Sequence, residues 1–285
     1  MNRWNCCLVS LCLLAAANLA SAYTTDTLQV PSAKMNKDVP VIVLLPNSYQ
    51  SGSGTFPVWY MLHGAGDDAT AWPRKTAIGQ MADIYGFIVV CPDAGTTSWY
   101  FDSPIDPAYQ YETFVSSELV GYIDGHYRTR LGAAFRAIGG NSMGGHGALF
   151  LSIRHPDVFG VAVGFSGGYD LTPFPKNWDI AMRIGAYKSH KKLWKELSVV
   201  TQAKKLANNR IAISFECGVD DFFIKNNREL HQILLKNKID HEYTERPGIH
   251  GWVYWRPNLQ YQALFVAKQF EKAEKDSFVS GRIVQ

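Results

Sequence analysis

Residues 136–145 read RAIGGNSMGG and contain a Gly-x-Ser-x-Gly pattern centred on Ser142. A short apolar run at 137–139 precedes the pattern, and a run rich in small residues follows it at 145–148. A strand, a tight turn and a helix in this order hold a serine hydroxyl exposed at the end of a sheet, where it can act as a nucleophile. The flanking glycines are needed because side chains there would clash with the neighbouring strand and helix. The alternative is an ordinary glycine-rich turn.

The rest of the chain alternates strand-like and helix-like runs, which is typical of a mainly parallel sheet with helices on both faces. Strands are expected at residues 27–31, 39–45, 58–62, 87–91, 137–139, 160–165, 210–216 and 241–245, with the first two forming an antiparallel hairpin. Helices are expected at residues 76–85, 111–126, 145–155, 226–237 and 258–272. Together with the turn at Ser142, this pattern predicts an α/β-hydrolase fold with about eight strands.

The chain has 285 residues, which suits one large α/β domain. Residues 1–22 read as a secretory signal peptide, because Arg3 precedes an apolar run and residues 20–22, Ala-Ser-Ala, match a cleavage site. A buried N-terminal helix is the alternative. We therefore expect an exported protein, periplasmic or secreted, in which residues 23–285 form a single catalytic domain. The stretch 169–206 is long for one crossover and predicts a small cap-like insertion.

Charge, hydropathy and cysteine positions bear on nucleic-acid binding, membrane crossing and disulfide formation. The net charge of +3 gives no indication of a nucleic-acid surface. After residue 22 no stretch is long and apolar enough to cross a membrane. Cys91 and Cys217 fall on predicted strands that three others separate, which is too far for a disulfide. We therefore expect two free, buried thiols.

The histidine expected to act as base is His250. A serine hydroxyl is a weak nucleophile until a base removes its proton, and in this fold an acid and then a histidine follow the serine along the chain. His250 lies on a glycine-flanked loop after the last predicted strand. His241 lies within a strand pattern, and His146 precedes the acid, so His146 is expected to serve in packing.

The acid is expected in the sequence CGVDDF at residues 217–222, which follows a predicted strand. Asp220 and Asp221 both lie on this loop, and the chemistry alone does not separate them. The aspartate that is not the acid would cap the turn.

Backbone N–H groups must stabilise the oxyanion that forms during acyl transfer. The N–H of Met143, directly after the nucleophile, is one candidate. The second should come from a loop after an earlier strand, and residues 63–66, His-Gly-Ala-Gly, supply it through the N–H of Ala65. His63 itself is expected to organise this loop. The mechanism implies neither a metal nor an organic cofactor.

Four motifs, at residues 60–67 with Trp72, 136–145, 217–221 and 248–252, resemble those of the esterase D-like esterases. That family includes feruloyl and acetyl-xylan esterases of carbohydrate esterase family 1, tributyrin esterases, S-formylglutathione hydrolases and mycolyltransferases. The resemblance implies Asp221 as the acid, because feruloyl-esterase members carry Cys-Gly-x-x-Asp at this loop. It also supports Ala65 and Met143 as the oxyanion donors. Residues 169–206 match nothing in the family pattern, which leaves the acyl preference open.

These residues predict an exported serine carboxylesterase in which Ser142 attacks an ester carbonyl, His250 takes the proton and Asp221 orients the imidazole. A feruloyl or acetyl ester of plant polysaccharide is the expected substrate. A thioesterase like S-formylglutathione hydrolase is disfavoured, because that thioester is a cytosolic metabolite. An acyltransferase with the same triad is the nearest alternative, and a non-catalytic binding protein on this scaffold would be expected to have lost a triad member.

Trp99, Tyr100, Trp252 and Trp255 lie close in sequence to the elements that should form the cleft. Such rings can stack on a phenolic acyl group or on a sugar, and packing in the core or at the rim is the alternative. The expected partner is therefore a small ester or an ester carried on a polysaccharide. The sequence leaves the oligomeric state open.

Overall fold

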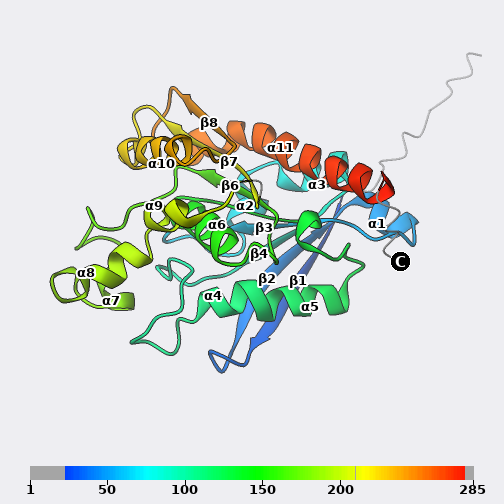
Figure 1. Ribbon diagram of the computed structural model, residues 1–285. Helices are drawn as coiled ribbons and strands as arrows, with labels where there is room; N and C mark the ends of the chain where they lie inside the picture. Colours follow the sequence, from blue (N-terminus) through cyan, green and yellow to red (C-terminus); the bar gives the residue numbers. More distant parts are fainter. Residues whose placement is uncertain (1–22, 209, 280–285) are drawn as a thin grey trace, which may run out of the picture.

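A computed structural model describes residues 23–208 and 210–279, so the predicted signal peptide lies outside the described residues. One eight-stranded sheet of order β1-β2-β4-β3-β5-β6-β7-β8 runs through this part of the chain (Figure 1). Its strands are β1 (Thr24–Ser32), β2 (Lys37–Leu45), β3 (Val58–Leu62), β4 (Ile88–Pro92), β5 (Arg136–Asn141), β6 (Val161–Phe165), β7 (Ala212–Gly218) and β8 (His241–Arg246).

The predicted hairpin forms one edge of this sheet. β1 pairs with β2 in antiparallel register, and β2 pairs with β4 in the same sense. Every later pair, from β4–β3 to β7–β8, is parallel. Parallel strands end at one edge of a sheet, where α/β proteins bind their ligands. The loops after β3, β5, β7 and β8 therefore open on the same edge, and the predicted α/β-hydrolase architecture is confirmed.

Helices cover both faces of the sheet, as predicted. The α-helices of the described residues are α1 (Asn47–Ser51), α2 (Ala71–Lys75), α3 (Ile78–Tyr85), α4 (Tyr111–Thr113), α5 (Leu119–His126), α6 (Met143–Arg154), α7 (Ile180–Ile184), α8 (Tyr187–Glu196), α9 (Val199–Gln202), α10 (Ile224–Lys236) and α11 (Trp252–Val279). A π-helical segment, Phe114–Glu118, joins α4 to α5, so the helix predicted over 111–126 is continuous but locally widened.

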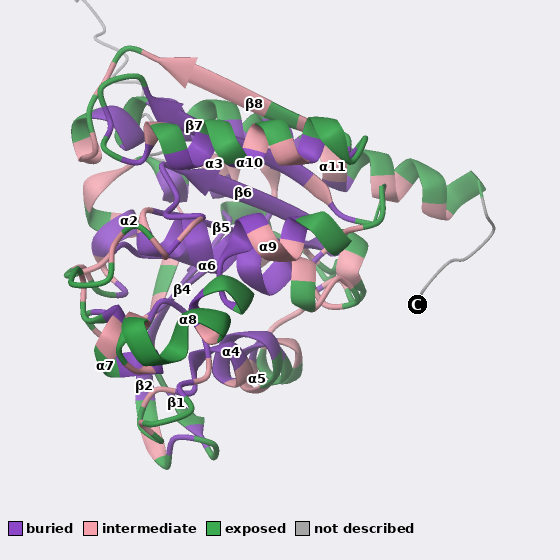
Figure 2. Ribbon diagram, turned by 60° about the vertical axis from the view of Figure 1, so that its left-hand side comes forward, coloured by how far each residue is buried: buried purple, intermediate pink, exposed green. Residues whose placement is uncertain are grey.

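The sheet separates two hydrophobic cores. In β3, Val58, Tyr60 and Leu62 belong to the core beneath α5, α6 and α10, whereas Trp59 and Met61 belong to the core beneath α3 and α11. Successive side chains of a strand point to opposite faces, so a strand buried on both sides is apolar throughout. Figure 2 shows the central strands buried, while the edge strand β8 is only partly covered.

The last helix, α11, begins earlier than predicted. The expected helix spanned residues 258–272. The helix instead begins at Trp252 and accommodates Pro257 within it. Its first residue therefore comes two positions after His250, and the helix fixes the end of the loop that carries this histidine.

The stretch 169–206, predicted as a cap-like insertion, contains α7, α8 and α9. Figure 1 shows α7 and α8 at the left, away from the sheet. Polar contacts tie this segment to the loop after β4. Trp99 Nε1 donates to the carbonyl of Trp178 at 3.1 Å, and the Arg183 guanidinium lies 3.0 Å from the Asp106 carboxylate.

Cys91 on β4 and Cys217 on β7 are free and buried, as expected. Three strands lie between β4 and β7, and burial raises the pKa of both thiols.

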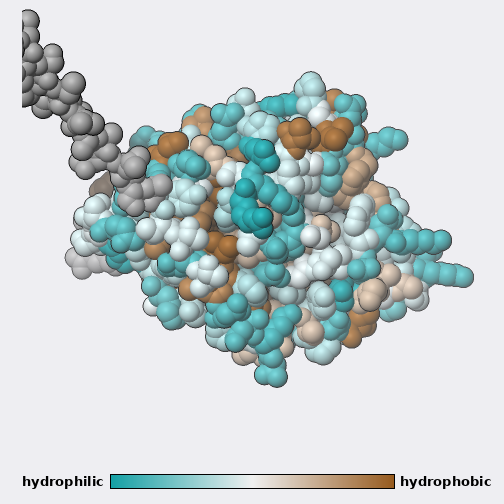
Figure 3. Space-filling model, turned by 180° about the vertical axis from the view of Figure 1, so that it is seen from behind, coloured by the Kyte–Doolittle hydropathy of each residue, from teal (hydrophilic) through white to brown (hydrophobic). Residues whose placement is uncertain are grey.

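No helix among the described residues is long and apolar enough to span a membrane. On the face seen in Figure 3, hydrophobic side chains appear in small groups among polar ones.

Candidate active site

The turn between β5 and α6 holds Ser142 in a conformation that side chains rarely adopt, with φ 56° and ψ −115°. The strand and helix approach each other closely here. A Cβ added to Gly140 would lie 2.6 Å from the backbone of Gly144, and one added to Gly144 would overlap the carbonyl oxygen of Leu62. Only glycine fits at these two positions, so the turn can present the serine hydroxyl at the edge of the sheet.

Of the three side chains predicted for catalysis, His250 lies within hydrogen-bonding distance of both Ser142 and Asp221. His250 Nε2 is 2.9 Å from Ser142 Oγ, and His250 Nδ1 is 2.8 Å and 3.0 Å from the two carboxylate oxygens of Asp221. With Nδ1 protonated and donating to the carboxylate, Nε2 is free to accept the serine proton. Asp221 is buried, whereas His250 is partly exposed toward the pocket described below.

The acid loop distinguishes the two aspartates that the chemistry left open. Asp221 Oδ1 accepts a second hydrogen bond from the N–H of Phe223 at 2.7 Å, which fixes the orientation of the carboxylate. Asp220 is exposed, and its N–H donates to the carbonyl of Gly248 at 3.0 Å, which joins the acid loop to the loop of His250. The geometry therefore agrees with Asp221 as the acid and with Asp220 as a turn residue.

A buried ion pair lies where these two loops begin. Glu216 of β7 accepts a hydrogen bond from Arg246 of β8 at 2.7 Å, and Glu216 is 0% exposed. An arginine normally lowers the pKa of a carboxyl, but here loss of solvent outweighs it and raises the pKa of Glu216 to about 7. Desolvation outweighs the effect of Arg246 on this pKa because Glu216 Oε1 has no hydrogen-bond partner among the described residues.

We expect Glu216 to make the protein less stable as the pH rises. Its folded pKa of about 7 lies above the ordinary value of 4.5, so its proton favours the folded state below pH 4.5 and this contribution is lost as the pH rises through 7. Relative to a Glu216→Gln variant, the wild type should lose about 2 kcal/mol of unfolding free energy between about pH 5 and pH 8. Urea denaturation at both pH values measures the difference, and parallel pH profiles would contradict the expectation.

A pocket of about 150 Å³ opens beside the triad. The residues that line it are Gly64, Ala65, Asp67, Asn141, Ser142, Trp178, Phe222, His250 and Trp255. Ala65, the predicted oxyanion residue of the β3 loop, is therefore at the site. Met143 is the first residue of α6, whose N-terminal end carries partial positive charge. A Cβ added to Gly64 would lie 3.4 Å from Ser142 Cβ, so the β3 loop packs directly against the nucleophile.

His63 and His146 are buried and serve the structure around the site, as predicted. His63 Nε2 accepts a hydrogen bond from the N–H of Ala94 at 2.9 Å, and burial lowers the pKa of its imidazole. The ring nitrogens of His146 contact the carbonyls of Trp99 and Leu197 at 3.2 Å and 2.9 Å, and burial lowers its pKa to about 4. Both imidazoles are therefore neutral at neutral pH.

Trp99 and Tyr100, two of the candidates for stacking on substrate, pack in the core instead, which was the stated alternative. Trp99 is 1% exposed and Tyr100 is 0% exposed. The Trp99 ring packs against His146, and the Tyr100 hydroxyl donates to the carbonyl of His63 at 3.0 Å. Both backbones have positive φ angles, 55° and 60°, which turn the chain so that the rings enter the core.

Trp252 and Trp255 both come from the first turn of α11, but only Trp255 contacts the triad. Trp255 lines the pocket, its ring centroid is 4.9 Å from that of His250, and its Nε1 donates to Ser166 Oγ at 3.1 Å. Trp252 Nε1 donates to Asp67 at 3.1 Å, and its ring packs edge-to-face on Trp255. Trp252 therefore supports two lining residues, and Trp255 faces the pocket itself.

Two aromatic residues that line the pocket were missed in the sequence. Trp178 lies in the insertion 169–206, which matched no family pattern. Phe222 directly follows Asp221, and its position next to the acid was the available signal. The two rings stack with centroids 5.8 Å apart and form one wall of the pocket.

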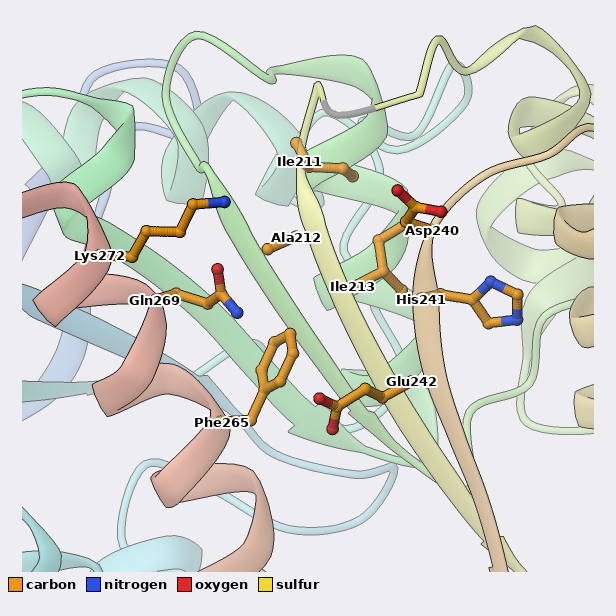
Figure 4. A pocket seen from close by; sticks show the side chains of 9 residues that line it. All are labelled: Ile211, Ala212, Ile213, Asp240, His241, Glu242, Phe265, Gln269 and Lys272. Atoms are coloured by element: carbon orange, nitrogen blue, oxygen red, sulfur yellow. The ribbon is translucent and has the colours of Figure 1, made fainter. Parts of the chain in front are cut away.

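A larger hollow, of about 420 Å³, lies at the opposite edge of the sheet (Figure 4). It opens where β7 and β8 begin, and Figure 4 shows Phe265, Gln269 and Lys272 of α11 along its other side. It contains no serine or cysteine nucleophile, so its size does not make it the active site.

Among the residues that the structure describes, no cluster of three or more His, Cys, Asp or Glu is arranged to bind a metal.

Comparisons with known proteins cover most of the chain. The model of a family described as "Putative esterase" matches residues 32–266. An acetyl esterase from Caldicellulosiruptor saccharolyticus is 25% identical over 267 residues, covering 86% of this chain and 96% of the relative. The diacylglycerol acyltransferase/mycolyltransferase Ag85A of Mycobacterium tuberculosis is 31% identical over 272 residues, covering 82% and 78%. A ferulic acid esterase of known structure superposes with a TM-score of 0.75 at 28% identity, covering 87% and 98%.

Proposed function

Since the chain belongs to this esterase family and is a carboxylic ester hydrolase, we propose that it forms an acyl-enzyme on Ser142, with His250 as base and Asp221 as the orienting acid. The observation that carries this proposal is the unbroken series of hydrogen bonds from Ser142 Oγ through the imidazole to the Asp221 carboxylate. Ser142 attacks the ester carbonyl while His250 Nε2 takes the hydroxyl proton. His250 then gives that proton to the leaving alcohol, and water hydrolyses the acyl-enzyme by the same steps.

The oxyanion is stabilised in this mechanism by the backbone N–H groups of Ala65 and Met143. Donors fixed in advance where charge develops provide a large part of the catalysis of acyl transfer. Ala65 lines the pocket that contains Ser142, and Met143 follows the nucleophile at the start of α6, which supports both assignments.

The substrate that we propose is a feruloyl or acetyl ester of plant polysaccharide. A pocket of about 150 Å³ is comparable to a cavity that accepts one benzene ring, so an acetyl group or a single aromatic ring fits beside the serine. The stacked rings of Trp178 and Phe222 favour an aromatic acyl group at this wall. Similarity to an acetyl esterase and to a ferulic acid esterase supports the same two classes.

A substrate panel tests this proposal. Methyl ferulate, acetylated xylan, tributyrin and S-formylglutathione are compared by kcat/KM with one enzyme preparation. We expect methyl ferulate or acetylated xylan to give the highest value. A clear preference for S-formylglutathione would replace the polysaccharide ester with a thioester as substrate.

Trp178 should set the preference for an aromatic acyl group. In a Trp178→Ala variant we expect kcat/KM for methyl ferulate to fall about tenfold or more, because one face of the acyl ring loses its stacking partner. Turnover of p-nitrophenyl acetate should change by less than about threefold, since an acetyl group has no ring to stack on this wall. Phe278, an exposed aromatic residue near the end of α11, provides the control, and Phe278→Ala should leave both rates unchanged. Equal losses on both substrates would contradict a role in acyl selection.

We propose that the protein is exported to the periplasm or the exterior, because residues 1–22 have the pattern of a cleaved signal peptide. Protein isolated from the producing cells should then begin near residue 23. An intact N-terminus in a cytosolic fraction would contradict this.

An acyltransferase is the second candidate function, and the 31% identity to Ag85A favours it. Such an enzyme would pass the acyl group from Ser142 to a sugar hydroxyl instead of to water. Turnover of p-nitrophenyl acetate with xylobiose as acceptor separates the two activities. Free acetate as the main product supports the hydrolase, and acetylated xylobiose in excess supports the transferase.

A further inference from the structure

Asn141, the residue before the nucleophile, is buried without hydrogen bonds. It ends β5, its side chain is 0% exposed, and neither Oδ1 nor Nδ2 has a partner among the described residues. Buried amides are nearly always paired, because an unpaired one lowers the stability of the fold. Several other described side chains leave one buried polar atom unpaired, whereas Asn141 leaves both. An unpaired amide next to the nucleophile lowers stability, which suggests that it forms its hydrogen bond with a bound substrate.

The unpaired amide packs against the β3 loop, which carries the proposed oxyanion donor Ala65. Asn141 lines the same pocket as Ser142, Ala65 and His250, and none of the other residues with an unpaired buried atom does. The point where a Cβ on Gly64 would sit is 2.8 Å from Asn141 Nδ2 and 3.4 Å from Ser142 Cβ. The amide and the nucleophile therefore flank the loop that carries the N–H of Ala65.

We propose that Asn141 is a catalytic residue whose Nδ2–H group donates a hydrogen bond to the carbonyl oxygen of the bound ester. The inference rests on the proposed function of Ser142. As Ser142 Oγ adds to the carbonyl carbon and its proton passes to His250 Nε2, the C=O π pair moves onto the oxygen, and the amide stabilises that charge together with the N–H groups of Ala65 and Met143. Asn141 itself forms and breaks no covalent bond. The free enzyme keeps its donor unpaired and in place for the transition state.

Asn141→Leu tests this directly, because leucine has a similar shape and no polar atoms. We expect kcat/KM for p-nitrophenyl acetate to fall about 100-fold, mostly through kcat. We also expect the melting temperature to stay the same or rise, since two unpaired buried polar atoms are removed. Asn141→Ala, which also lacks the donor, should lose at least as much activity. A lower melting temperature with unchanged kcat in the folded fraction would overturn the proposal.

A second readout separates contact with the oxyanion from general effects on packing. A trifluoromethyl ketone adds to the serine and generates the oxyanion, whereas the product carboxylic acid only occupies the pocket. In Asn141→Leu the Ki of the ketone should rise in parallel with the loss of kcat/KM, and the Ki of the acid should change by less than about threefold. Equal weakening of both inhibitors would contradict a bond formed in the transition state.

The failure of this inference is distinguishable from failure of the proposed function. If wild-type protein hydrolyses p-nitrophenyl acetate and reacts with a fluorophosphonate while Asn141→Leu keeps the wild-type rate, only the role of Asn141 is refuted. If the wild-type protein neither hydrolyses the ester nor reacts with the fluorophosphonate, the function of Ser142 is refuted and that of Asn141 with it.

Discussion

A Ser142→Ala variant should lose at least about a thousand-fold in kcat for p-nitrophenyl acetate. The hydroxyl oxygen lies 2.9 Å from His250 Nε2 and is the atom that would carry the acyl group, so alanine removes the covalent route entirely. The remaining oxyanion donors account for residual activity above the uncatalysed rate. Because alanine adopts the same backbone conformation about as readily as serine, the melting temperature should change little.

A buried serine on the helix that follows the nucleophile supplies the matched control. Ser152 of α6 donates its hydroxyl to the carbonyl of Leu149 at 3.1 Å and does not line the pocket. Ser152→Ala should retain wild-type kcat, and it should still react with a fluorophosphonate. Full turnover or full labelling of Ser142→Ala would refute the assigned nucleophile.

Asp221→Asn should lower kcat by about ten-thousand-fold near neutral pH, judging from the same substitution in a related triad. The reason is specific to this loop. The N–H of Phe223 bonds Oδ1 at 2.7 Å, which should keep oxygen at that position in the variant and direct the new NH₂ group toward His250 Nδ1. The imidazole would then carry its proton on Nε2, where it can no longer accept the proton of Ser142.

The adjacent aspartate makes a stringent comparison. Asp220 is exposed, and its described hydrogen bond is made through the backbone, so Asp220→Asn should change kcat by less than about threefold. Both variants lose one negative charge from the same loop, which controls for the change in local charge. A larger loss in Asp220→Asn than in Asp221→Asn would reassign the acid.

The middle of the sheet was predictable because β3, β4 and β6 are apolar and buried on both faces. The predicted strand 58–62 is β3 residue for residue, and the other strands differ from prediction by a few residues at their ends. Ser142 and His250 were identified from their order and loop positions alone, whereas the choice of Asp221 over Asp220 needed the family resemblance. The three side chains meet because parallel strands bring their loops to one edge, which is a property of topology.

Side-chain direction in the loops was beyond the reach of sequence. Trp99 and Tyr100 follow the strand β4 as expected, but their positive φ angles send both rings inward, and no propensity predicts that conformation for aromatic residues. Trp178 reaches the pocket through long-range contacts of the insertion, such as the bond from Thr97 Oγ1 to Asp179 at 3.1 Å. The unpaired amide of Asn141 depends on how the β3 loop packs against the end of β5, and the Gly-x-Ser-x-Gly motif does not specify the residue at that position.

The attachment of the insertion bears on how such an enzyme can diversify. Trp178 belongs to a segment tied to the loop after β4, whereas Ser142, Asp221 and His250 come from the ends of three other strands. Mutations in that segment can therefore reshape the acyl wall while the reacting atoms keep their positions. We therefore expect substitutions in this segment to change which ester is preferred without displacing the triad.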